Sequence, residues 1–165
     1  MILHMLFGPF RTQYVCLLLL IACSHAAPLA APDGNPSPTA QERTTLATSF
    51  TAERLYAWQQ RLNLQDWKIS VVVSRATELK PKTLGNIHWD SEKKTAMIRV
   101  LDPADYKMPL ASMLDDMEFT IVHELIHLEL SPVLSPLQRN EENRREEEYA
   151  VNHMAQALLD LHHGK

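Results

Sequence analysis

Residues 119–128 read Phe-Thr-Ile-Val-His-Glu-Leu-Ile-His-Leu and place two histidines four positions apart in a largely apolar run. Residues four apart lie on the same face of an α-helix, one turn from each other. A helix over this stretch therefore presents the imidazoles of His123 and His127 side by side. Because histidines on a buried helix need a polar partner, the pattern predicts that both rings bind one metal ion.

Glu124 follows the first histidine and lies about 100° from it around the helix axis. Its carboxylate can therefore reach a water molecule beside the metal rather than the metal itself. Catalytic zinc sites take three protein ligands and keep a fourth position for water, whose pKa falls to about 7. We therefore expect His123 and His127 to bind one Zn²⁺ and Glu124 to act as the general base.

The third ligand must come from another element. The metzincin arrangement needs glycine at position 130 and histidine at position 133, and Leu130 and Val133 exclude it. An acidic run, residues 146–148, begins about twenty residues after His127. A loop and the start of a helix are enough to bring one of its carboxylates back over the histidines.

The pattern His123-Glu124-x-x-His127, followed by Glu148-x-x-x-Asn152-x-Met154-Ala155-x-x-Leu158-Leu159, resembles the gluzincin branch of the zincin metallopeptidases. Within that branch, residues 55–162 are similar to small single-lobed zinc metallopeptidases of phages and bacteria. The resemblance implies a peptide or protein substrate. It also implies a minimal zincin-like α+β domain, with a small twisted β-sheet packed against an active-site helix and a C-terminal ligand helix. In zincins an edge strand aligns the substrate, and residues 95–101 or 85–89 are expected to do so here.

Glu148 is the preferred third ligand, because it lies one helical turn before Asn152, which can support His123 or the carboxylate from behind. Glu147 is the alternative ligand, since it falls on the core-facing stripe, where an unpaired carboxylate is costly. Tyr149 and His153 on the same helix are candidates to stabilise an oxyanion, a role that zincins often give to such residues.

The coarse pattern of the remaining chain predicts a helix capped by Ser49 or Thr51 and three strands, over residues 67–73, 85–89 and 95–101. The motif helix is expected to begin within residues 112–116 and to end at Ser131-Pro132. A last helix is expected over residues 141–162. The order of helix, small sheet, helix and helix indicates an α+β architecture.

Residues 1–26 have the layout of a secretory signal, in which Arg11 precedes an apolar run over residues 14–23. The run of about ten residues is too short to cross a bilayer, so no transmembrane span is expected in the mature chain. Residues 20–23 also resemble a bacterial lipobox, which implies lipid anchoring at Cys23. Residues 27–45 are expected to be a flexible linker rich in Pro and Ala, and residues 46–165 the catalytic domain. The protein is thus expected in the bacterial periplasm, as a membrane-anchored lipoprotein, or otherwise secreted.

The net charge of −4 argues against a nucleic-acid partner, because such proteins usually carry a basic surface. Two alternatives to a peptidase remain open. One is an exported envelope protein that binds metal without catalysis, and the other is a zinc-free domain in which the histidines are incidental.

Overall fold

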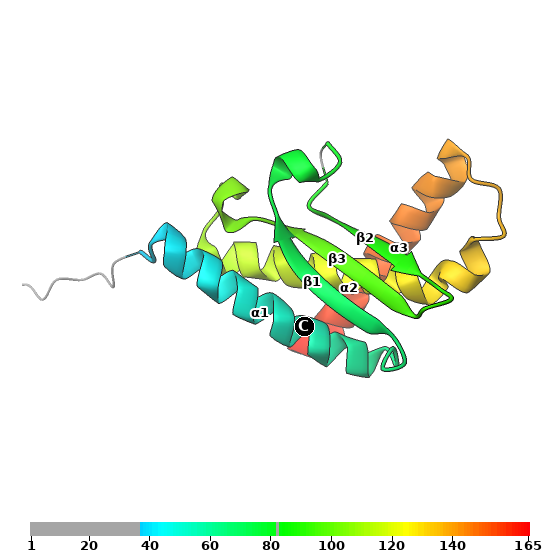
Figure 1. The fold of residues 1–165 in the computed structure, drawn as a ribbon, viewed down its shortest axis with the longest axis horizontal. Helices are drawn as coiled ribbons and strands as arrows, with labels where there is room; N and C mark the ends of the chain where they lie inside the picture. Colours follow the sequence, from blue (N-terminus) through cyan, green and yellow to red (C-terminus); the bar gives the residue numbers. More distant parts are fainter. Residues whose placement is uncertain (1–36, 82) are drawn as a thin grey trace, which may run out of the picture. The chain divides into compact units, whose positions relative to one another are not determined.

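The computed structural model describes residues 37–81 and 83–165 (Figure 1). It has the α+β architecture expected from the sequence. The elements are, in chain order, α1 (Ala40–Arg61), β1 (Lys68–Ser74), the 3₁₀ helix η1 (Ala76–Glu78), β2 (Gly85–Asp90), β3 (Thr95–Leu101), the 3₁₀ helix η2 (Pro103–Asp105), α2 (Leu110–Leu134) and α3 (Glu141–His163). The predicted signal over residues 1–26, with Cys23, lies outside the described residues.

The three strands form one mixed sheet in the order β1-β3-β2 (Figure 1). The central strand β3 pairs in parallel with β1 and antiparallel with β2. Its residues Ile98 and Val100 are fully buried, as their alternation with more polar residues predicts. Because β3 has a neighbour on both sides, only β2 or β1 can offer a free edge. The expectation that residues 95–101 align a substrate is therefore wrong.

The sheet packs against α1 and α2, and α3 packs against α2. The motif helix α2 therefore lies between the sheet and the last helix, and its buried side chains surround most of its axis. A helix buried on several sides is apolar over most of its surface, which explains the composition of residues 119–128. None of the helices within the described ranges combines the length and apolar character needed to cross a bilayer.

Helix α1 begins earlier than expected. Thr39 is its N-cap, and a capping box links the Thr39 hydroxyl to the Glu42 amide and the Glu42 carboxylate to the Thr39 amide. Residues 40–45, assigned to the flexible linker, are therefore helical. Ser49 and Thr51 lie inside the helix rather than at its cap, and the buried Thr51 hydroxyl donates to the Ala47 carbonyl at 2.8 Å.

Helix α2 is longer than predicted at both ends. It begins at Leu110, and it continues past Pro132 to Leu134. A proline lacks the amide of one helical hydrogen bond, but here less than a turn of helix follows it. The Ser135 amide then closes the end by donating to the Ser131 carbonyl at 2.9 Å. Helix α3 ends at His163, one residue later than predicted, and the left-handed Gly164 caps it.

Gly85 lets β2 approach α2 closely. A Cβ at this position would lie 2.6 Å from the Arg99 carbonyl oxygen and closer still to the Thr120 methyl group on α2. Glycine is therefore the residue that fits between β3 and α2 at the start of β2. This contact sets the distance between the edge strand and the helix that carries the histidines.

A buried carboxylate joins the three helices. Glu118 on α2, 3% exposed, accepts a hydrogen bond from the Trp58 indole at 2.8 Å. Arg54 on α1 and His163 on α3 place nitrogen atoms 3.8 and 3.4 Å from its oxygens. The ring of His162 meets that of Trp58 edge-on at 5.4 Å. These contacts hold the C-terminal turn of α3 against α1 and α2.

Replacing Glu118 with alanine should lower the free energy of unfolding by about 2–4 kcal/mol, because it leaves a buried indole and a half-buried guanidinium without their acceptor. Glu129→Ala is the matched control, since Glu129 is exposed on the same helix, and it should change stability by less than about 0.5 kcal/mol. Urea unfolding followed by circular dichroism measures both. Equal midpoints for the two variants would contradict the structural importance of Glu118.

Candidate metal centre

Three ligand atoms converge between α2 and α3. The Nε2 atoms of His123 and His127 are 3.0 Å apart. The Glu148 carboxylate places one oxygen 3.4 Å from the first and 3.7 Å from the second. A tetrahedral ion with ligands at about 2.0–2.1 Å holds neighbouring ligand atoms about 3.3 Å apart. These three residues can therefore hold one metal ion.

The opposite nitrogen of each ring has an oxygen partner. His123 Nδ1 lies 3.1 Å from Asn152 Oδ1, and His127 Nδ1 lies 3.0 Å from Glu147 Oε1. An oxygen acceptor at Nδ1 selects the tautomer that carries its proton there. Both Nε2 lone pairs then point at each other and at the Glu148 carboxylate. A metal cation placed between them would satisfy all three acceptors.

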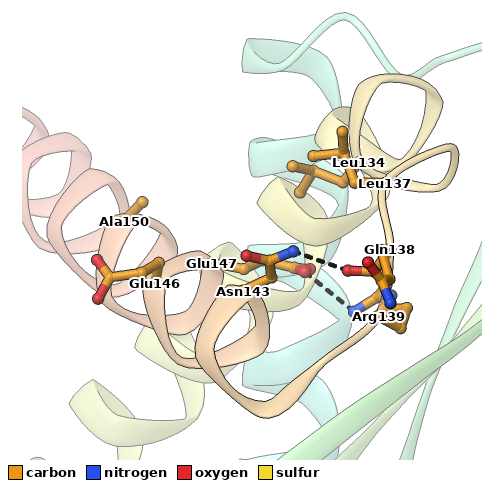
Figure 2. A pocket seen from close by; sticks show the side chains of 8 residues that line it. All are labelled: Leu134, Leu137, Gln138, Arg139, Asn143, Glu146, Glu147 and Ala150. Atoms are coloured by element: carbon orange, nitrogen blue, oxygen red, sulfur yellow. Dashed lines mark hydrogen bonds and ion pairs between the residues drawn. The ribbon is translucent and has the colours of Figure 1, made fainter.

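Glu147 is not placed as a third ligand. Its carboxylate contacts the outer nitrogen of His127, on the far side of the ring from Glu148. Its second oxygen accepts a hydrogen bond from Arg139 at 2.9 Å (Figure 2). Burial of this side chain, which suggested a ligand from the sequence, is offset by these two partners. Glu147 is therefore positioned to hold His127 rather than to bind the ion.

The electrostatics of the cluster favour a positive charge at its centre. Hydrogen bonds with His123 and His127 hold the pKa of Glu148 well below its usual range. Burial by itself lowers the pKa of His127, but the hydrogen bond with Glu148 and the charges of nearby carboxylates outweigh burial and raise that pKa overall. The surroundings therefore stabilise either an imidazolium or a metal cation at the same place.

Glu124 lies beside the cluster and is not part of it. Its side chain is buried and lines a cavity of about 600 Å³ that also exposes both histidines and Glu148. Burial raises the pKa of Glu124, against the smaller lowering effect of the two histidines. The other walls come from β2, from the loop before it and from the turns of α2 and α3, including Gly85, Asn86, Ile87, Trp89, Phe119 and Thr120.

Tyr149 and His153 do not face this cavity. Their rings lie 4.1 Å apart on the exposed side of α3, and His153 Nδ1 contacts the Tyr149 carbonyl oxygen at 2.8 Å. Each follows a site residue by one position, which turns it about 100° around the helix. Neither side chain therefore lies where it could contact an oxyanion formed in this cavity.

Three cationic residues at the cavity were missed from the sequence, namely Lys80, Arg139 and Arg144. Arg144 precedes Glu148 by one helical turn, so the spacing could have placed it on the ligand face. Lys80 and Arg139 come from loops, where no periodic pattern indicates which way a side chain points. Their positions depend on the packing of segments distant in sequence.

The sequence matches no protein-family model, and comparisons with curated proteins and with solved structures found no match. The zincin resemblance thus depends on the quoted motifs alone. That His123, His127 and Glu148 can hold a metal ion follows from their geometry and does not depend on similarity to another protein.

Alanine substitutions of Glu146, Glu147 and Glu148 distinguish their roles by their effect on Zn²⁺ affinity. Glu148→Ala should weaken Zn²⁺ binding by more than about 100-fold, because a ligand is lost, and Glu147→Ala by about 10- to 100-fold, because His127 loses its support. Glu146→Ala should bind as the wild type does, since Glu146 is exposed and does not line the site. Competition with a chromophoric chelator gives the three affinities. A larger loss for Glu147→Ala than for Glu148→Ala would reverse the assignment.

Proposed function

We propose that the protein is a zinc-dependent hydrolase, and specifically a metallopeptidase. The observation that carries the proposal is the convergence of two imidazole lone pairs and a carboxylate at one point, with a second, buried carboxylate beside it in an open cavity. Two imidazoles and one carboxylate, all close to tetrahedral spacing, form a donor set that suits Zn²⁺. When bound, zinc would polarise the substrate carbonyl and acidify a water molecule.

Glu124 is the general base of the proposed reaction. Its carboxylate accepts a proton from the attacking water and delivers it to the nitrogen of the leaving amine. The low-polarity surroundings that raise its pKa make it a stronger base than an exposed glutamate. Asn152 and Glu147 hold the two imidazoles in the required tautomer, and Arg139 holds Glu147.

The edge of β2 is the proposed binding site for the substrate main chain. β2 pairs with β3 alone, and four of its residues line the cavity. An extended peptide can add to such an edge through main-chain hydrogen bonds. That alignment would bring one peptide bond towards Glu124 and the histidines. The other free edge, that of β1, lies at the far end of the sheet from this cavity.

Export is part of the proposal and depends on residues 1–26. The apolar run and Cys23 favour a lipid-anchored or periplasmic protein, or otherwise a secreted one. The rival function is an exported protein that binds metal without turning over a substrate. That rival needs His123, His127 and Glu148 but gives Glu124 no task.

Glu124→Gln should leave the Zn²⁺ content unchanged and lower peptide hydrolysis by at least about 100-fold, because the amide cannot accept the proton. Metal content is measured by mass spectrometry, and hydrolysis with a mixed peptide library. Glu129→Gln on the exposed side of α2 is the control and should retain full activity. Full activity of Glu124→Gln would refute this mechanism, and zinc-loaded wild type without any turnover would favour the non-catalytic rival.

A further inference from the structure

Cationic side chains from three separate segments surround the mouth of the candidate metal cavity. Lys80 lies in the loop between η1 and β2, Arg139 in the loop between α2 and α3, and Arg144 in the first turns of α3. The loop that carries Lys80 is distant in sequence from the other two segments, and all three segments meet at this cavity. They therefore form a feature of the site and not of one helix surface.

The cations change the charge that a substrate meets. They equal in number the three carboxylates that line the same cavity, which are Glu124, Glu147 and Glu148. A divalent ion held by neutral imidazoles and Glu148 then leaves the cavity with a net positive charge. The chain as a whole carries a net charge of −4. A positive cavity in an acidic protein draws anionic groups towards the centre.

Two of the three cations are available to a ligand. Arg139 is already bound to Glu147, which in turn holds His127. Lys80 is exposed at the rim, and its charge acts on Glu124. The Arg144 side chain is 54% exposed; its partner Glu141, 76% exposed, lies outside the cavity lining, so a competing carboxylate can replace it at little cost.

We propose that the substrate carries a carboxylate close to the cleaved bond, and that Lys80 and Arg144 select it. The inference rests on the proposed peptidase function and names its substrate class, an acidic peptide. The carboxylate can come from an Asp or Glu side chain or from the C-terminus of the peptide. Both sources present the same planar anion to an ammonium and a guanidinium group.

Binding of three matched peptides tests the selection without requiring turnover. The reference peptide carries glutamine and an amidated C-terminus, the second replaces glutamine with glutamate, and the third keeps glutamine but has a free C-terminus. Fluorescence anisotropy with zinc-loaded Glu124→Gln protein gives their affinities. At least one carboxylate peptide should bind roughly tenfold more tightly than the reference, with an advantage that shrinks as salt is added. Whichever of the two gains identifies the source of the carboxylate.

The double variant Lys80→Ala/Arg144→Ala, made in the same protein, should reduce this advantage to less than about twofold. Arg145→Ala is the matched control, because Arg145 is the exposed neighbour of Arg144 and does not line the cavity; it should keep the full advantage. Lys80→Arg/Arg144→Lys retains both charges and should restore most of it. Circular dichroism verifies that each variant is folded.

Two results would overturn the inference. One is equal binding of all three peptides, and the other is an advantage that survives the double variant, since the carboxylate would then bind the metal itself. Failure of the proposed function is a separate outcome. If the wild type cleaves none of the peptides while the binding preference follows Lys80 and Arg144, the peptidase activity is refuted and the anion selectivity stands.

Discussion

The candidate site depends on one contact between α2 and α3. The Nε2 atoms of two histidines on α2 lie next to each other and next to a carboxylate oxygen of Glu148 on α3. The rings of His123 and His127 are one turn apart on a rigid helix, so their spacing is fixed by helix geometry alone. Their tautomers are fixed from α3, by Asn152 and Glu147. Neither helix can shift along the other without separating a nitrogen from its acceptor. The capacity to hold a cation thus depends on how the two helices pack.

Polar contacts hold helix α3 against α2 near both of its ends. Near its start, the Arg139–Glu147–His127 chain ties it to α2, and near its end the contact between His163 and Glu118 does the same. Between them, its buried residues Val151, Ala155 and Leu159 pack into the core that α2 shares with the sheet. Apolar burial supplies most of the binding between the helices, while the polar contacts at the two ends fix their register.

Local patterns in the sequence predicted most of the fold. Alternation located the strands, and β3 agrees with its prediction at both ends because half of its side chains are buried in regular order. Helix ends are harder to predict, because caps decide them. The capping box of Thr39 and Glu42 starts α1 inside the expected linker, and α2 continues past Pro132 because a helix tolerates proline near its end. The arrangement of α3 against α2 depends on contacts between distant residues that no local pattern reveals.

The candidate site divides in the same way. His123, Glu124 and His127 follow from spacing on one helix, and Glu148 with Asn152 from spacing on another. The choice between Glu147 and Glu148 needed the relative rotation of the two helices, since each carboxylate contacts a histidine of α2, although Glu147 is 12% exposed and Glu148 is 42% exposed. Asn152 and His153 are neighbours on α3, but the helix turns about 100° between them. Asn152 therefore contacts His123, whereas His153 points to another side of the helix. Loop residues such as Arg139 and Lys80 had no periodicity to place them.

Two buried glutamates on α2 show how the surroundings separate a structural carboxylate from a reactive one. Glu118 and Glu124 are similarly withdrawn from solvent, at 3% and 7% exposure. Glu118 is met by an indole, a guanidinium and an imidazole, which offset the cost of burying its charge. Glu124 instead faces a cavity next to an electron-rich cluster, and burial raises its pKa. A carboxylate buried beside the candidate metal site at that cost is positioned to exchange a proton with a bound molecule, which is the role that the proposed hydrolase needs and that a non-catalytic metal site does not.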